Sequence, residues 1–491
     1  MSSRCPVVGE RLNGVNATTC TAILFLFLLG PSRALAQSAP TSADRPWRSP
    51  QEKPIADAAR KLREFRFEID PTQTYSLTEL IDLAERHNPE TRVAWERARA
   101  QAAALGLARS ELYPTLEAAA LSQTYRSQIL FGDQFFRQTV QDFQVLLELN
   151  YTVFDFGARS GRIDAEKAQV LAANFAFNDT HREIIYQVAQ AYYRLLNALG
   201  QEDAARASLL NAQTVQQAAE DRLAHGLATL PDVLEARSAT AQAEFDLQAV
   251  IGSEEIARGD LATAAGTPAT AAIHVQPLDQ VPTPDAIGDT VDQAIDRALE
   301  QRPDLLRQVA EIRSADARNK EARAAYYPEL TLNVGPAAQS VYGLQQQLPR
   351  AHTAGLIGGV SVNLQWTVFD GGARKNKLAQ AGANARAAEA QANVTRDRIA
   401  DEVWAAYSNL NTAFRQRRAS LALLEAANNS YAAALESYNY GLRNLLDVTA
   451  TQRTLAQARS ADVLARTQVL TALADLAFRT ADSIQQSATQ P

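Results

Sequence analysis

The same phrase occurs twice in this chain, far apart. Residues 150–159 read NYTVFDFGAR, and residues 365–374 read QWTVFDGGAR. Three more pairs of phrases recur in the same order and at almost the same offset: SLTELIDLA with TVDQAIDRA, LYPTL with YYPEL, and GLATLPDV with GLRNLLDV. Such self-similarity indicates a duplicated structural unit. We predict a first repeat at 76–279 and a second at 280–484, with a Pro-rich leader at 37–75 and a short tail at 485–491.

The N-terminal residues 1–36 have the form of a secretory signal peptide. Two arginines precede the apolar run at 22–29, and a small-x-small cleavage site ends at Ala36. The alternative, a membrane anchor, is disfavoured because the apolar run is too short to span a bilayer. Both cysteines of the chain lie in this segment, so the exported protein is expected to contain no disulfide and no thiolate metal site.

Each repeat is predicted to contain two β-strands, at about 115–125 and 143–155 in the first and at about 329–342 and 357–369 in the second. In the second strand of each pair, apolar residues alternate with polar ones, which gives one apolar and one polar face. The linking segments 126–141 and 343–355 are polar or mixed and are predicted as loops. Each strand has about the length of a membrane-spanning strand, ~9–11 residues.

These strands admit two readings. One is a soluble amphipathic sheet that packs on helices. The other is a membrane β-barrel, because beyond the signal no apolar run approaches the ~20 residues of a spanning helix, and lipid accepts β-structure only as a closed barrel. Four strands are too few to close a barrel, whereas three chains would supply twelve. The membrane reading therefore predicts a trimer.

Long segments without Gly or Pro follow the strands in each repeat, at 162–199 and 383–440. They are rich in Ala, Gln, Glu, Arg and Leu, which favour helices. The second of them would make a helix of about 87 Å at 1.5 Å per residue. Helices of this length predict an elongated bundle or coiled coil.

The repeat layout, the Tyr-Pro and Thr-Val-Phe-Asp-x-Gly-Ala-Arg junctions, and the two Gly-x-x-x-x-x-Asp-Val turns together resemble the TolC family of outer-membrane efflux and secretion ducts, over residues 76–484. The resemblance implies a mainly α fold with transmembrane β: a homotrimer whose 12-stranded outer-membrane β-barrel continues into a long periplasmic α-helical barrel. It implies a passive channel of a tripartite efflux pump or type I secretion system, in the outer membrane of a Gram-negative-type bacterium. The implied partners are a periplasmic adaptor (membrane fusion) protein, an inner-membrane transporter of RND, ABC or MFS type, and outer-membrane lipid.

The same resemblance implies a gate at the periplasmic end of the helices. Gly226 and Gly441 match the two tip turns, where glycine permits a positive φ. Three further residues match a latch that holds the tips closed: Asp232, Tyr438 and Arg443. A carboxylate can accept hydrogen bonds from both a phenol and a guanidinium, which suits this role. The alternative is that Asp232 caps a helix and Tyr438 only packs.

Asp447 matches a ring of carboxylates that lines the constriction and favours cations. The alternative for Asp447 is again helix capping. The family pattern often has a second Asp three positions later, but Ala450 stands there, so the ring is expected to carry less charge. Pro231 is an uncommon residue at such a tip and is expected to stiffen the turn.

The twice-written phrase itself is interpreted as the joint between barrel strand and tunnel helix. Asp155 and Asp370 are placed to cap the following helices, and Gly157 and Gly372 are placed to let the chain turn. An Asp-x-Gly motif could also be catalytic, but its duplication favours the structural role.

Little in the sequence favours an enzyme or a metal protein. The five histidines are scattered without metal-ligand spacing, and HExxH, GxSxG and P-loop motifs are absent from the sequence. No catalytic residue, cofactor or metal site is therefore expected. The net charge of −7 argues against a nucleic-acid partner. The competing hypothesis is a non-conducting trimeric coiled-coil scaffold or adhesin, which would explain the helices and the signal peptide but not the repeated strand pairs.

Overall fold

The computed structural model describes residue 44 and residues 52–61, 69–284, 286, 288, 290–345 and 349–482. The chain divides into two units, residues 1–66 and 67–491. The first unit contributes one described helix, α2 (Glu52–Lys61). The predicted signal peptide, most of the predicted leader and the predicted tail lie outside the described residues. All other described helices and strands belong to the second unit.

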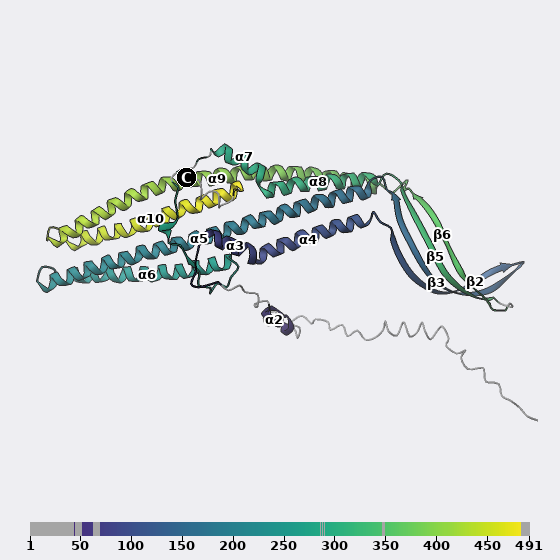
Figure 1. The fold of residues 1–491 in the computed structure, drawn as a ribbon, viewed down its shortest axis with the longest axis horizontal. Helices are drawn as coiled ribbons and strands as arrows, with labels where there is room; N and C mark the ends of the chain where they lie inside the picture. The colour runs from purple at the N-terminus through teal and green to yellow at the C-terminus, as the bar shows by residue number, and fades with distance from the viewer. Residues whose placement is uncertain are drawn as a thin grey trace, which may run out of the picture. The chain divides into compact units, whose positions relative to one another are not determined.

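One antiparallel sheet of four strands lies at one end of the long helices, in the order β2-β3-β5-β6 (Figure 1). The strands are β2 (Thr115–Phe131), β3 (Gln134–Phe154), β5 (Glu329–Gln345) and β6 (Ala351–Gln365). Among the described residues, the two outer strands, β2 and β6, each have one unpaired edge. In the described residues neither face of the sheet is covered by a helix, which is not the arrangement of a soluble sheet packed on helices.

The strands differ from the predicted ones at their ends. Residues 126–131 and 134–141 were predicted as a loop, but they are paired strand, and the chain turns at Gly132 with φ +65°. The loop prediction relied on polar composition, and here Gln, Thr and Ser occupy paired positions. The predicted strand at 357–369 is also wrong at both ends, since β6 begins at Ala351 and ends at Gln365.

The faces of the sheet follow the predicted alternation. Phe143, Val145 and Leu147 of β3 share one face, and their cross-strand partners on β2 are Ser122, Ala120 and Ala118. The opposite face is mainly polar, and there Asp142 is buried and accepts hydrogen bonds from three glutamine side chains on β2, β3 and β5. The apolar face is bare: Val145, for example, is 64% exposed.

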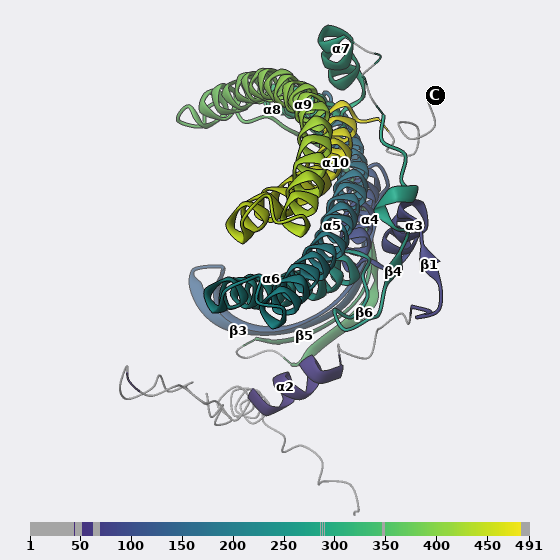
Figure 2. The same ribbon diagram turned by 90° about the vertical axis from the view of Figure 1, so that its left-hand side faces the viewer.

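Two long helical hairpins extend from the sheet (Figure 1). The first is α5 (Ala158–Ala224) with α6 (Leu230–Ala264), and the second is α9 (Ala373–Asn439) with α10 (Leu445–Thr480). Helices α4 (Pro89–Ser110) and α8 (Pro303–Ala324) run beside the sheet-proximal halves of α5 and α9. Seen along the helices, α9, α10, α5 and α6 lie in one curved layer (Figure 2).

The long helices are longer than predicted because isolated glycines do not end them. Helices α5 and α9 each have 67 residues, or about 100 Å at 1.5 Å per residue. Gly200 lies inside α5, where a Cβ would stand 2.7 Å from Val463 Cγ1 on α10. This glycine therefore permits close approach between the two hairpins.

The α-helices and the long strands of the two repeats correspond one to one. Helices α3 (Leu77–His87) and α7 (Val291–Gln301) have 11 residues each, α4 and α8 have 22 each, and strands β2 and β5 have 17 each. Beside the middle of the hairpins, β1 (Thr74–Tyr75) pairs in parallel with β4 (His274–Val275), and a short 3-10 helix, η2 (Leu278–Gln280), follows. None of the described helices is apolar over a length sufficient to cross a membrane.

Candidate functional site

The two joints between strand and helix have the same geometry. Asp155 accepts the N–H of Gly157 at 3.1 Å and the N–H of Arg159 at 2.8 Å, and it also pairs with the Arg159 side chain at 2.8 Å. Asp370 accepts the N–H of Gly372 and of Arg374, each at 3.0 Å, and pairs with the Arg374 side chain at 2.7 Å. Each carboxylate thus satisfies N–H groups at the start of a long helix.

Backbone conformation explains the glycines of the joint. Gly157 has φ +98° and Gly372 has φ +91°, a region that side-chain-bearing residues avoid. Hydrogen bonds from the backbone N–H of Arg374, from its side chain and from the backbone N–H of Gly372 lower the pKa of Asp370. Burial raises the pKa of Asp155, but hydrogen bonds from Arg159 and Gly157 outweigh it and lower the pKa overall. Both carboxylates are therefore held ionised at their helix N-termini.

At the far end of the hairpins, glycines end α5 and α9. Gly226 has φ +68° and Gly441 has φ +74°. The residue after each glycine donates its backbone N–H to a carbonyl oxygen in the last turns of the helix. Leu227 donates to Arg222 O at 2.8 Å, and Leu442 donates to Ser437 O at 2.9 Å. This is the C-terminal motif that glycine favours. The tips of both hairpins are therefore built alike.

The residues of the predicted latch are not joined to one another within the described chain. Asp232 accepts the backbone N–H of Thr229 at 2.9 Å and its hydroxyl at 2.7 Å, in a capping box at the start of α6. Arg443 is exposed. Tyr438 is 4% exposed, and its hydroxyl has no hydrogen-bond partner among the described residues. Capping by Asp232 and packing by Tyr438, the alternative roles, are thus present in the chain.

Arg222, which the sequence analysis missed, contacts Tyr438 instead. Its guanidinium donates to the carbonyl oxygen of Tyr438 and lies 4.6 Å from the centre of the Tyr438 ring. This contact joins the end of α5 to the end of α9. Burial raises the pKa of the Tyr438 phenol, Arg222 opposes that rise, and Asp232 adds to it. Arg222, Asp232 and Tyr438 therefore share one electrostatic environment at the tips.

Asp447 lies in the first turn of α10 and is partly exposed. Its backbone N–H donates to Asn444 Oδ1 at 3.0 Å, so Asn444 caps the helix. The N-cap residue is therefore Asn444 rather than Asp447, and among the described residues the Asp447 carboxylate accepts no hydrogen bond at the start of α10. Ala450, on the next turn, is exposed, and so is Pro231 at the other tip. The Nδ1–H of His225 donates to the Asp221 carbonyl oxygen at 2.7 Å, in an exposed turn.

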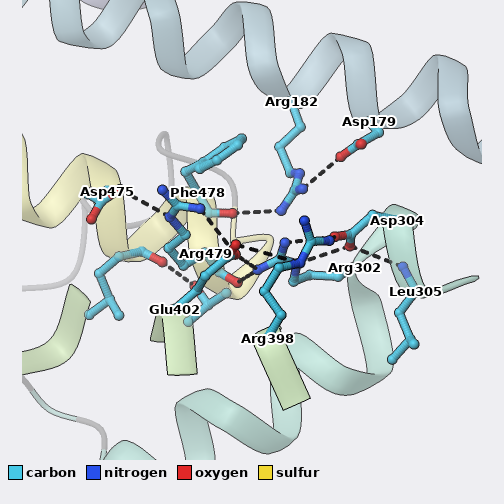
Figure 3. Close-up of polar contacts among 12 residues, drawn as sticks. Asp179, Arg182, Arg302, Asp304, Leu305, Arg398, Glu402, Asp475, Phe478 and Arg479 are labelled. Carbon is cyan, nitrogen blue, oxygen red and sulfur yellow. Dashed lines mark hydrogen bonds and ion pairs between the residues drawn. The ribbon is translucent and has the colours of Figure 1, made fainter. Parts of the chain in front are cut away.

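A second polar cluster lies where α7, α8, α9 and α10 meet (Figure 3). Arg302, 3% exposed, pairs through two nitrogens with Asp304 at 2.8 and 3.0 Å, and with Glu402 at 2.8 Å. Arg398 contacts Asp304 at 3.2 Å, and Arg479 contacts Glu402 at 3.1 Å. We call these five residues the charge cluster. Burial raises the pKa of Asp304, but the hydrogen bonds and charge of Arg302 outweigh it and lower the pKa.

The charge cluster connects the end of α10 to the first repeat as well. Asp475 accepts from Arg479 at 3.3 Å and from the Tyr186 hydroxyl on α5 at 2.7 Å. Burial first, and then the bond to Asp475, raise the pKa of Tyr186 to about 12. Arg182 of α5 donates to the Phe478 carbonyl at 2.7 Å. The last turn of α10 is thus held from both repeats.

Comparison with known proteins gives the family. The family model described as outer membrane efflux protein matches residues 80–267 and 294–481, one match in each repeat. The chain belongs to the outer membrane efflux protein family. This family consists of outer-membrane channels for efflux and secretion through tripartite systems, and such channels are not enzymes. The chain therefore acts in the outer membrane, and the alternative of a non-conducting scaffold is set aside.

Individual relatives agree with the family. The chain is 29% identical over 414 residues to Protein CyaE of Bordetella pertussis, covering 83% of this chain and 84% of that protein. It is 26% identical over 407 residues to outer membrane protein OprJ of Pseudomonas aeruginosa, covering 82% of each. Among solved structures, a membrane protein from Pseudomonas aeruginosa superimposes with a TM-score of 0.72 at 26% identity, over 82% of this chain and 93% of that one.

Proposed function

We propose that three copies of the chain assemble into one channel, with the four-stranded sheets joined into a barrel of twelve strands and the curved helical layers joined into a tube. The support comes from the edges of the protomer. Strand β2 and strand β6 each leave one edge unpaired, and a long unpaired edge is a template for another strand. Different edges that meet head to tail form a ring when the rotation closes.

The helices follow the same order as the strands. Helices α4 and α6 lie at one border of the helical layer and α9 lies at the other. Large apolar side chains are bare at these borders, including Trp95 on α4 and Trp404 on α9, at 46% and 56% exposure. A neighbouring chain would cover them. The bare apolar face of the sheet would then meet lipid and the mainly polar face would line the lumen, as in outer-membrane barrels.

The proposed work of the channel is passive conduction. A periplasmic adaptor and an inner-membrane transporter would deliver the substrate to the α-helical end, and the barrel would release it outside. The assembled channel is tested by its mass in detergent and its conductance in planar bilayers. A trimer that gives discrete conductance steps is expected. A monomer that gives no conductance would refute the proposal.

We propose further that the hairpin tips close the channel at its periplasmic end. Arg443 is exposed and would pair with Asp232 of a neighbouring chain. The Tyr438 hydroxyl is buried and has no hydrogen-bond partner among the described residues, so it would have to be uncovered at the tip to join that contact. Asp447 would supply one carboxylate per chain to the constriction. Replacing Tyr438 by Phe and Arg443 by Ser together should raise the conductance several-fold. Unaltered conductance would show that these residues do not form the latch.

A further inference from the structure

On β3 the unbroken run of apolar residues on the apolar face of the sheet ends at Phe143, while the exposed pair Leu130 and Phe135 lies on the same face nearer the hairpin turn. On β3 this face carries Phe143, Val145 and then every second residue to Val153, with no charged side chain among them. The stretch covers about 34 Å of strand at about 3.4 Å per residue. At a tilt of about 40° it is about 26 Å tall, close to the apolar band of ~25 Å that outer-membrane barrels present to lipid.

A layer of aromatic rings follows directly beyond Phe143. Tyr342 of β5 stacks on His352 of β6 with ring centres 4.2 Å apart, and Phe143 meets the edge of Tyr342 at 6.3 Å. Ser340 and His352 are hydrogen-bonded at 3.0 Å. Rings with one apolar and one polar side concentrate at the boundary between lipid and water. This boundary therefore lies near Tyr342 and His352.

Beyond the rings, on the same face, lie two arginines. In strands β2, β3, β5 and β6 as described, Arg126 and Arg137 are the only arginines, no lysine occurs, and His352 is the one other basic side chain. Arg126 pairs across the strands with Thr139, and Arg137 pairs with Gln128, so the two arginines are diagonal neighbours on one face. That spacing is about 7–8 Å between backbones. Basic residues on a four-stranded sheet thus occur at one end and on one face.

Both guanidinium groups are open to a ligand. Arg126 and Arg137 are exposed, and in the described part of the chain neither forms an ion pair with a carboxylate. Arg126 Nε donates to Thr139 Oγ1 at 3.1 Å, which holds the side chain across the strands. On this face, the described strand residues beyond Phe143 include no Asp or Glu. The opposite face, by contrast, carries Glu117, Asp142 and Glu148 and no basic residue among its described positions.

We infer that Arg126 and Arg137 bind the phosphate groups of an anionic lipid in the outer leaflet, with the rings of Tyr342 and His352 at the top of its acyl region. The inference rests on the proposed membrane barrel, because it needs the apolar face to be in lipid. Two guanidinium groups can each make paired hydrogen bonds to phosphate oxygens. A free anion would meet the arginines equally well, but only an amphiphile also uses the bare apolar face below them.

The test uses the full chain as the purified assembled channel and two probes, bisphosphorylated lipid A and the same lipid with its phosphates removed. Retained lipid is measured by native mass spectrometry over a lipid titration. We compare the wild type with the double variant R126Q/R137Q. The control is R396Q/R453Q, which removes the same charge from exposed side chains of α9 and α10. Near a membrane surface each arginine contributes about 1 kcal/mol, so the double variant should weaken binding of the phosphorylated lipid about thirtyfold.

The control should bind like the wild type, and the dephosphorylated lipid should bind weakly to all three proteins. Equal retention by wild type and R126Q/R137Q would overturn the inference. So would an equal loss in the control, which would reduce the effect to net charge, or displacement of the lipid by millimolar inorganic phosphate. Conductance is recorded from the same preparations. Absence of conductance in every protein would count against the proposed channel, while the lipid titration would still decide the fate of the arginine site.

Discussion

Arg222 offers the most direct test of how the tips stay together. Its side chain contacts both the carbonyl oxygen and the ring of Tyr438 and so connects α5 to α9, beside a shared hydrophobic cluster. We consider Arg222→Met, which keeps the aliphatic stem and removes the charge and all donors. The lost hydrogen bond from a charged donor is worth about 1.5–3 kcal/mol. The lost cation–π contact adds about 0.5–1 kcal/mol at a partly exposed site.

The expected effect is therefore about 2–3 kcal/mol per chain, after allowance for solvent at the tip. Since 1.4 kcal/mol is a factor of ten, the balance between joined and separated hairpins should shift by about 30- to 150-fold. The separated state should then be populated about 30- to 150-fold more, relative to the joined state, than in the wild type. Single-channel recordings of the reconstituted channel should show larger conductance and longer openings than the wild type.

The matched control is Arg237→Met. Arg237 also lies near a tip and pairs with Glu220 at 2.9 Å, but both residues belong to the α5–α6 hairpin. This variant removes the same charge without cutting the link between hairpins, so its conductance should stay near the wild-type value. If Arg222→Met and Arg237→Met give the same conductance, the link between the hairpins does not hold the gate and the reasoning is refuted.

Three further predictions concern other parts of the chain. Asp447→Asn should move the reversal potential in a salt gradient towards that of a non-selective pore, because the carboxylate is uncommitted to capping; an unchanged potential would place selectivity elsewhere. Arg302→Met should lower the free energy of unfolding, measured by denaturant titration, by about 3–5 kcal/mol, because it leaves Asp304 and Glu402 without their buried partner. The control Arg396→Met, at an exposed position, should change the free energy of unfolding by less than about 0.5 kcal/mol in the same titration. Asp370 has a lowered pKa in the folded protein, so its contribution is present above the unfolded value of 3.8 and is lost as the pH falls through the folded value. Asp370→Asn should therefore be less stable than the wild type at pH 7 and should lose less stability on acidification, and parallel pH curves for the two proteins would contradict this.

The parts of the molecule that could be predicted from sequence are those that depend on neighbours in the chain. The joint at Asp370 needs only Gly372 and Arg374, and the tip at Gly226 needs only the preceding helix turn. Arg222 could not be found in this way, since its partner Tyr438 is 216 residues away. The hairpin ends of the strands were missed for a different reason. A run of polar residues predicts a loop when only the sequence is considered. In the folded chain, however, the backbones of these residues are hydrogen-bonded to the neighbouring strand.

The charge cluster was not predicted because Arg302 stands at a position equivalent to Asn88 of the first repeat, where the side chain only caps a helix. Asn88 in the first repeat and Arg302 in the second have the same backbone conformation, with φ/ψ of −68°/126° and −65°/123°. Asn88 caps α4 by accepting the Glu90 N–H at 2.8 Å, whereas Arg302 reaches Glu402 on another helix. The available signal was the Asn-to-Arg replacement directly before the shared proline, in His-Asn-Pro of the first repeat and Gln-Arg-Pro of the second.

The matched lengths of the hairpins have a consequence for how this family can change over evolutionary time. Helices α5 and α9 have 67 residues each, and α6 and α10 have 35 and 36. Loss of seven residues from one helix alone would withdraw its tip by about 10.5 Å. The other helix of that hairpin would need the same deletion to remain paired with it. Both helices of the second hairpin would then also need it, so that the two tips end at the same distance from the sheet. A single insertion or deletion is therefore penalised, and the length of such a channel is inherited in coordinated steps across both copies of the repeat.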